Sequence, residues 1–325
     1  MAQRIDWDSQ LGRRMRLRDL HVFTTVVRLG SMAKAGKELG VSQPAVSEVI
    51  ADLESALGVQ LLDRTPQGVE PTAYGAALLK RSIAAFDELR QGIRDIEYLA
   101  DPTIGEIRIG CPESIAAAFL QPIISLFVKS HSGVVLDVDT VNTLTFSPRL
   151  RDRTLDLVLA RAGFPLDEPH LVEDLNIEPL FDDALLVVVN RKHPLARRRT
   201  VEFTQLAAEP WILTGKDSWN YQVIADAFQQ HGLQSPKIQI KTLSVHLRAN
   251  MVATGKFVTT FPRSVVLLHG ERLGLKVLPI ELPSRSWPVL AVTLKNRTVS
   301  PIVERFLDCA RSAAHSLSQQ TAASG

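Results

Sequence analysis

The stretch VSQPAVSEVIADLE, residues 41–54, predicts a helix whose first apolar residues, Val46 and Ile50, are set back behind small and amide side chains. Ser42 is a favoured N-cap residue, and Pro44 falls in the first turn, where its missing N–H is not needed. Taken alone, these residues favour an ordinary cap in front of a core helix. The alternative is a first turn that is pushed into a partner and read through hydrogen bonds.

The flanking sequence predicts two more helices and a hairpin. Apolar residues recur at helical spacing from Leu17 to Val27, and a second short helix is expected over about 32–39. Gly30 and Gly40 suit the left-handed conformation that ends a helix. Two short helices joined by a glycine-containing turn are typical of a helix-turn-helix. The stretch VQLLDRTPQGVEPT, residues 59–72, then predicts two strands around a turn, which makes the motif winged.

Residues 30–79 resemble the DNA-binding region of LysR-type transcriptional regulators, and the chain's length and domain order also fit that family. The positions that carry the resemblance are Gly30, Ser31, Ala35, Leu39, Val41, Ser42, Gln43, Pro44, Ala45, Val46, Ser47, Leu53, Glu54, Leu57, Gly58, Leu61, Arg64, Thr72 and Gly75. This run is far more specific than a generic helix-turn-helix match. It therefore favours the DNA-reading interpretation of the first turn.

The resemblance implies a set of DNA contacts. The groove-facing residues would be Ser42, Gln43, Pro44, Ala45 and Ser47. A glutamine at this place can pair with adenine or donate to guanine, and small side chains can meet a thymine methyl group. Contacts to phosphate or the minor groove would come from Arg18, Ser31, Lys34 and Arg64.

The charges near the motif depart from the family pattern. Basic residues often follow the position of Ser47 in the family, whereas Glu48, Ala51 and Asp52 follow here. The chain carries a net charge of only +2. We therefore expect weaker phosphate attraction, or attraction shifted to residues 13–18 and the wing.

Residues 73–100 contain no proline and predict one long helix with an apolar seam. One interpretation is a helix that packs on its own domain; the other, favoured by its length and by the resemblance, is a linker that pairs two chains. The seam residues are Leu79, Ile83, Phe86, Leu89, Ile93 and Ile96. The resemblance further implies a homodimer or homotetramer that contacts RNA polymerase on double-stranded DNA.

From residue 104 onward, strands alternate with helices, which predicts mainly parallel sheets in two lobes. The expected helices include 114–129, 147–153 and a final one over 301–313. The resemblance implies a periplasmic-binding-protein-like pair of lobes, crossed near 178–183 and again near 268–275. The predicted fold is α/β. The winged helix-turn-helix spans 1–72, the linker 73–103 and the effector domain 104–317, with lobe I over about 104–178 and 274–317 and lobe II over about 179–273.

Ligands in such folds bind where strands end and helices begin. The residues expected at these places are Glu113, Ser114, Thr143, Arg161, Thr214, Ser218, Trp219, Thr259 and Phe261. Ser114 is equally well explained as a helix cap, and Arg161 as half of an ion pair. The expected effector is an organic or aromatic acid or a sugar. Cys111 lies nearby, but without a resolving cysteine close in sequence a buried structural thiol is favoured.

The rest of the sequence argues against other classes of protein. It shows no phosphate-binding glycine loop, no nucleophile elbow and no zinc-ligand spacing, so we expect no enzyme, metal or cofactor. It has no apolar run of membrane-spanning length and no secretion signal at its start, which favours a cytoplasmic protein. A cytoplasmic ligand-binding protein without DNA regulation is the alternative. The DNA-reading turn favours a ligand-responsive, sequence-specific transcriptional regulator.

Overall fold

The computed structural model describes residues 15–65, 68–140, 146–161, 172–216, 218–283 and 287–323. It divides into two compact units, Met1–Gly92 and Ile93–Gly325, and the division falls within the long helix α5 (Ala73–Ala100). In the part of the chain described here, no helix has the length and apolar character to cross a bilayer.

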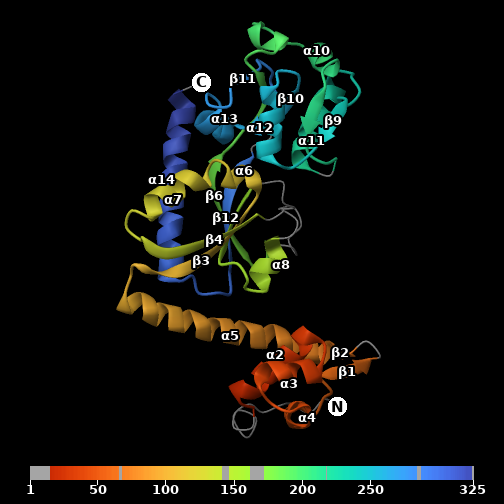
Figure 1. Cartoon of the computed structure of the whole chain (residues 1–325), viewed down its shortest axis with the longest axis vertical. Helices are drawn as coiled ribbons and strands as arrows, with labels where there is room; N and C mark the ends of the chain where they lie inside the picture. The colour runs from red at the N-terminus through yellow and green to blue at the C-terminus, as the bar shows by residue number, and fades with distance from the viewer. Residues whose placement is uncertain are drawn as a thin grey trace. The chain divides into compact units, whose positions relative to one another are not determined.

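The first unit is a three-helix bundle with a hairpin (Figure 1). Its elements are α2 (Leu17–Leu29), α3 (Met32–Leu39), α4 (Gln43–Leu57), β1 (Leu62–Thr65) and β2 (Gly68–Pro71). Gly30 and Gly40 end their helices in the left-handed conformation, with φ of 60° and 68°. The strands pair antiparallel, which confirms the predicted winged helix-turn-helix.

Close packing at the turn between α3 and α4 requires a glycine. A Cβ atom on Gly36 would lie 2.8 Å from the carbonyl oxygen of Val41. The backbone of this turn donates from the Val41 N–H to the Gly36 carbonyl oxygen. Gly36 therefore lets α4 begin directly against α3 and sets the direction of its exposed first turn.

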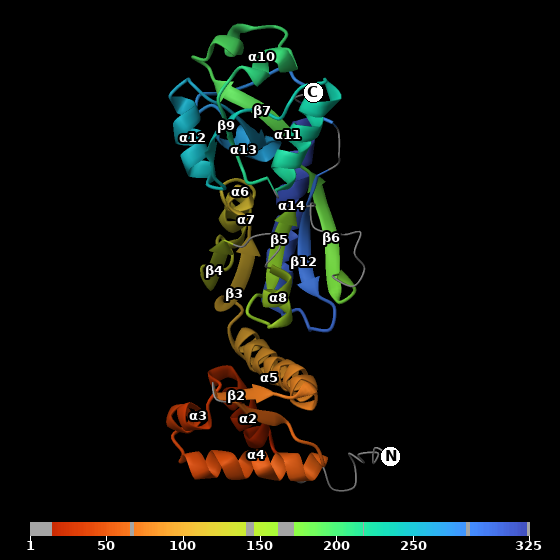
Figure 2. The same cartoon turned by 90° about the vertical axis from the view of Figure 1, so that its right-hand side faces the viewer.

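The second unit begins with lobe I, a five-stranded sheet with strand order β4-β3-β5-β12-β6. Its strands are β3 (Ile104–Cys111), β4 (Gly133–Thr140), β5 (Leu157–Arg161), β6 (Leu175–Asp182) and β12 (Pro288–Leu294). Its helices are α6 (Glu113–Ala116), α7 (Leu120–Phe127), α8 (Phe146–Arg151) and α14 (Pro301–Ala323). Figure 2 shows α8 and α14 on opposite faces of this sheet, each over its own apolar cluster.

Lobe II is a second five-stranded sheet, with strand order β11-β7-β10-β8-β9. Its strands are β7 (Leu185–Asn190), β8 (Trp211–Leu213), β9 (Ile238–Lys241), β10 (Val258–Pro262) and β11 (Leu275–Val277). Its helices are η2 (Pro194–Arg197), α10 (Phe203–Ala207), α11 (Trp219–Gln230), α12 (Val245–Ala253) and α13 (Arg263–His269). One apolar cluster lies under α10 and α11, and another lies under α12 and α13.

The structure corrects several sequence-based expectations. The sheets are mixed rather than mainly parallel, because β12 runs antiparallel to β5 and β6, and β7 runs antiparallel to β10 and β11. Since β11 belongs to lobe II, the chain returns to lobe I after Val277 rather than near 268–275. The helix expected over 114–129 is two helices, α6 and α7, and the final helix continues to Ala323.

Candidate functional site

The first turn of α4 is both capped and exposed. The Ser42 hydroxyl oxygen accepts a hydrogen bond from the Ala45 N–H at 3.4 Å, while Val46 and Ile50 are buried in the helical core. Gln43 and Pro44 are exposed on the same turn. The two sequence interpretations are therefore compatible, because the cap fixes a turn whose remaining side chains stay free for a partner.

Ser47 lies partly behind this turn. Its hydroxyl donates to the Met32 sulfur of α3 at 3.2 Å, and the side chain is half-buried. Glu48 and Asp52 are exposed further along α4. Ser47 is thus bonded within its own domain, whereas Gln43 and Pro44 are exposed.

The predicted phosphate contacts differ in how free they are. Arg18 and Lys34 are exposed. The Ser31 hydroxyl accepts from the Lys34 N–H at 3.3 Å, so it acts as the cap of α3. The Arg64 side chain lies outside the described part of the structure.

Glu54 positions the wing, a role that sequence reasoning did not assign. Its carboxylate oxygen Oε1 accepts from the backbone N–H groups of Leu61 and Leu62 at 2.7 and 3.1 Å. These bonds attach the start of β1 to the last turns of α4. The only signal in the sequence was the place of Glu54 among the residues that carry the family resemblance.

The predicted seam residues of α5 form two sets: one packs against the first unit, and the other is exposed. Leu79 packs against the helical core of the first unit, and the Phe86 ring lies edge-on to His21 with centroids 5.8 Å apart. The seam side chains further along are exposed, with Leu89, Ile93 and Ile96 at 49, 57 and 68% of their surface. The first part of the helix therefore packs on its own domain, as one interpretation predicts, and Ile83 in this part is half-buried. Pairing of two chains through the exposed part remains a prediction.

Between the lobes, Arg161 at the end of β5 is held by Ser114 and Asp183. Its Nη1 donates to Asp183 Oδ2 at 2.6 Å, and its Nε donates to the Ser114 hydroxyl at 3.2 Å. Asp183, directly after β6, also accepts from the Ser264 N–H and hydroxyl of lobe II at 2.8 and 2.6 Å. Burial lowers the pKa of Arg161, and the Asp183 charge opposes that shift. The arginine is thus half of a buried ion pair rather than a free counter-charge.

An aromatic stack covers this ion pair. The Trp219 and Trp287 rings are stacked with centroids 3.8 Å apart, and the Arg161 guanidinium lies 4.9 Å from the Trp287 ring centroid. Arg161 Nη2 and Trp287 Nε1 are buried without a hydrogen-bond partner among the described residues. The structure therefore brings three predicted effector residues, Ser114, Arg161 and Trp219, into one connected group, and it adds Trp287 and Asp183.

The other predicted effector residues are placed differently. Thr214 and Ser218 hydrogen-bond to each other, and Ser218 caps α11. Thr259 and Phe261 are completely buried in lobe II, and the Thr259 hydroxyl donates to the Ile212 carbonyl at 2.7 Å. These two side chains therefore have no free surface that a ligand could contact. Thr143 lies outside the described residues.

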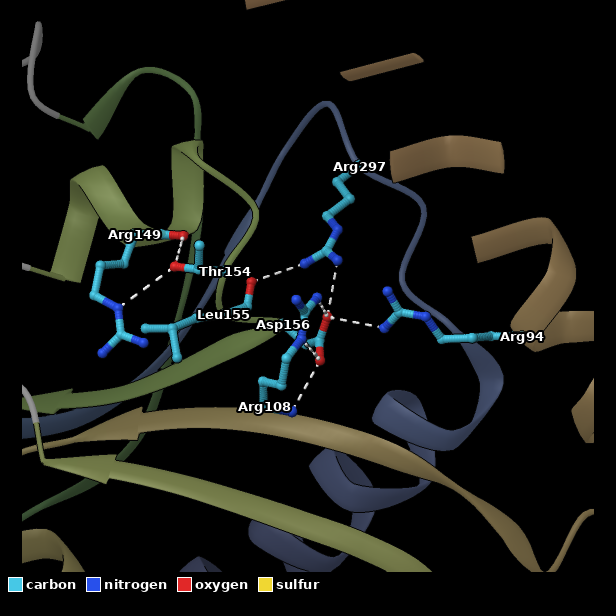
Figure 3. Close-up of polar contacts among 7 residues, drawn as sticks. All are labelled: Arg94, Arg108, Arg149, Thr154, Leu155, Asp156 and Arg297. Atoms are coloured by element: carbon cyan, nitrogen blue, oxygen red, sulfur yellow. Dashed lines mark hydrogen bonds and ion pairs between the residues drawn. The ribbon is translucent and has the colours of Figure 1, made fainter. Parts of the chain in front are cut away.

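The buried Asp156 carboxylate lies among three arginine side chains (Figure 3). Its carboxylate accepts from Arg108 Nε and Nη2 at 3.2 and 2.8 Å and from Arg297 Nη2 at 2.8 Å. Arg94, from the part of α5 that belongs to this unit, lies 3.7 Å away. Burial would raise the pKa of Asp156, but hydrogen bonds from Arg108 and the charges of Arg108 and Arg297 hold it below its ordinary value. The cluster joins the end of α5 to strand β3, to the residue before β5 and to the segment after β12.

Two further features carry no site. Cys111 is buried, and burial raises the pKa of its thiol to about 12, so it stays protonated as a structural thiol. A hollow of about 480 Å³ lies elsewhere on lobe II, lined by Arg191, Ala196, Leu275, Lys276 and Val277. None of the predicted effector residues lines it. Among the described residues, no three His, Cys, Asp or Glu side chains form a group that could hold a metal.

Comparison with known families matches both units. Residues 17–76 match the model of the bacterial regulatory helix-turn-helix protein, lysR family, and residues 100–315 match the LysR substrate binding domain. The two matches define a DNA-binding regulator joined to a ligand-binding domain. The chain belongs to the LysR family of transcriptional regulators, and it is a DNA-binding transcriptional regulator with an effector-binding domain.

Several characterised relatives span nearly the whole chain. HTH-type transcriptional regulator TdcA of Escherichia coli K12 is 28% identical over 292 residues, which are 90% of this chain and 91% of TdcA. The structure of ArgP from Mycobacterium tuberculosis is similar with a TM-score of 0.64 at 20% identity, covering 91% of this chain and 96% of ArgP. CbnR in complex with its target DNA gives a TM-score of 0.52 at 23% identity, covering 92% of this chain and all of CbnR. At these identities the structures establish the shared fold.

Proposed function

We propose that the first turn of α4 reads operator bases and that an effector bound between the lobes controls this reading. The observation that carries the first part is the exposure of Gln43 and Pro44 on a turn fixed by the Ser42 cap. A rigid, exposed amide can make two hydrogen bonds to one base edge. Arg18 and Lys34 are free to bind phosphate, which adds affinity without sequence information.

Replacing Gln43 by alanine should weaken binding to the operator by about 1–3 kcal/mol and leave binding to random DNA nearly unchanged. The reason is that the amide reads bases, whereas phosphate contacts supply the non-specific affinity. Operator fragments selected from random sequence, titrated at fixed salt against a scrambled duplex, measure both. Gln230→Ala, an exposed glutamine on α11, is the control. Equal weakening on both duplexes would remove Gln43 from base reading.

The effector site that we propose is centred on the group formed by Ser114, Arg161, Trp219, Trp287 and Asp183. Two buried donors in it, Arg161 Nη2 and Trp287 Nε1, have no partner among the described residues, and a ligand oxygen would satisfy them. Trp219, a member of the same group, contributes a flat aromatic ring. This arrangement favours a small organic or aromatic acid over a sugar, because it offers aromatic faces and these two buried N–H donors, from which a carboxylate oxygen can accept.

A thermal-shift screen of the full chain should identify such acids. A ligand present at 100 times its Kd stabilises the folded state by about 2.7 kcal/mol. A true effector should raise the unfolding temperature of the wild-type chain and have a markedly smaller effect on Trp219→Ala. Gln222→Ala, an exposed residue of the same helix, should respond as the wild type does. An equal shift in Trp219→Ala would exclude the tryptophan from the site.

We further propose that the chain assembles through α5. The exposed side chains of Leu89, Ile93, Ile96 and Leu99 continue along α5 at helical spacing. We expect a second copy of the chain to cover them, since two recognition helices then read two half-sites. A dimer of such dimers and contact with RNA polymerase complete the proposed regulator.

A further inference from the structure

Glu113 is a lobe I residue that binds lobe II. It opens α6, directly after β3 and Pro112. Its Oε1 accepts from the Ser244 hydroxyl at 3.2 Å and from the His246 N–H at 3.4 Å. Both partners lie at the start of α12, so one carboxylate bridges the two lobes.

The start of α12 is suited to an anion. Its first N–H groups have no partner within the helix, and the helix dipole favours negative charge there. The Ser244 hydroxyl accepts from the Leu247 N–H at 3.2 Å and so satisfies one of these donors. Glu113, from lobe I, supplies a charged acceptor to another.

A buried arginine on the same helix carries a donor that no described residue satisfies. Arg248, one turn into α12, is only 2% exposed, and its Nε is buried without a hydrogen-bond partner among the described residues. Its Nη1 donates to the Thr260 carbonyl oxygen at 2.9 Å, and its guanidinium lies 4.9 Å from the Phe261 ring centroid. Burial lowers the pKa of Arg248 to about 10, and the charge of Glu113 opposes the shift. The negative charge of Glu113 in lobe I thus acts on the buried cation of lobe II.

The far end of α6 is attached to lobe II as well. His269 Nε2 lies 2.6 Å from the Ala117 carbonyl oxygen, and Ala118 is fully buried in the apolar cluster under α12 and α13. The short α6 segment is therefore held at its start by α12 and at its end by α13. Only the first of these contacts has a carboxylate as its acceptor, so only that one is open to exchange with a soluble anion.

We infer that Glu113 is a tethered anion that holds the lobes together by filling an anion site formed by the first turn of α12 and Arg248. A carboxylate or phosphate group that reaches this turn must displace Glu113. That consequence rests on the proposed effector function. It predicts that an anionic ligand releases the contact between the lobes. The tethered contact itself requires neither an effector nor DNA.

The test is chemical rescue in the full chain, with acetate as the probe. Glu113→Ala should lower the unfolding temperature of the 93–325 unit, and acetate should restore much of the loss, whereas chloride at equal ionic strength should not. Acetate should bind Glu113→Ala about tenfold more tightly than it binds the wild-type chain, where the site is occupied. Glu106→Ala, which removes an exposed carboxylate of β3, should behave as the wild type does.

Hydrogen exchange at the His246 amide gives a second readout. Protection should fall in Glu113→Ala and return with acetate, and Glu113→Gln, which keeps an acceptor oxygen but no charge, should lie between. An unchanged unfolding temperature in Glu113→Ala, or an equal acetate response in Glu106→Ala, would overturn the inference. These readouts use acetate and no operator DNA. A negative result would therefore overturn this inference alone, and the proposals for Gln43 and for the effector site would stand or fall on their own tests.

Discussion

Replacing Asp156 by asparagine should lower the free energy of unfolding of the 93–325 unit by about 3–5 kcal/mol. The Asp156 carboxylate is 3% exposed and accepts from Arg108 and Arg297, with Arg94 at 3.7 Å (Figure 3). Asparagine keeps the shape of the side chain but removes the negative charge that these guanidiniums share. Denaturant unfolding followed by tryptophan fluorescence measures the loss, because Trp211, Trp219 and Trp287 all lie in this unit.

The control is Asp152→Asn, an exposed carboxylate four residues away, which should change stability by about 0.5 kcal/mol or less. The pH dependence adds a second check. Since the folded-state pKa of Asp156 is lowered, its contribution is fully present above the unfolded pKa of about 3.9 and is lost as pH falls through the folded value. The difference between wild type and Asp156→Asn should therefore hold from pH 7 to about pH 5 and shrink only in stronger acid. A difference that vanished near pH 6 would contradict the ion-cluster account.

The local structure of the first unit was predictable because its signals are short-range. Ser31 and Ser42 act as caps, Gly30 and Gly40 end helices, and the proline-free stretch gives α5 over Ala73–Ala100 as expected. Each of these depends on backbone chemistry within a few residues. The family resemblance covered the same region, so the two lines of reasoning agreed.

The lobes were predicted less well because their decisive contacts are long-range. Strand direction in a mixed sheet depends on where the chain crosses between lobes, and alternation of strand and helix does not encode it. The break between α6 and α7 was missed because the residues from Ile115 to Leu120 are all apolar, and because Pro122, which suits the first turn of a new helix, was overlooked. Ala118 at the break packs into the core of lobe II, a contact that the local sequence does not encode.

The candidate effector group illustrates the same limit. Sequence position identified Ser114, Arg161 and Trp219 as residues that end strands or begin helices. It gave no sign that Asp183 neutralises Arg161 or that Trp287 stacks on Trp219, because these pairs are far apart in the chain. Types of residue at strand ends can be predicted; which of them pair cannot.

Asp183→Asn should be the second strongly destabilising change, with a loss of about 3–5 kcal/mol in the unfolding of the same unit. The Asp183 side chain is 1% exposed and the Arg161 side chain 4%, so removing the carboxylate leaves a buried guanidinium without its counter-charge. Asparagine keeps one acceptor oxygen for the Ser264 N–H, but its NH2 group replaces the oxygen that accepts from the Ser264 hydroxyl and from Arg161. Denaturant unfolding of the full chain measures the change.

A double mutant separates this account from a general packing defect. Arg161→Met combined with Asp183→Asn removes both charges and keeps an unbranched side chain under Trp287. Because an apolar replacement of a buried ion pair is often nearly neutral, the double mutant should be more stable than Asp183→Asn alone. If the two losses simply added, the ion pair would not be what holds the end of β5 to the crossing between the lobes. In that case the loss of the buried charge would not be the cause of the instability of Asp183→Asn.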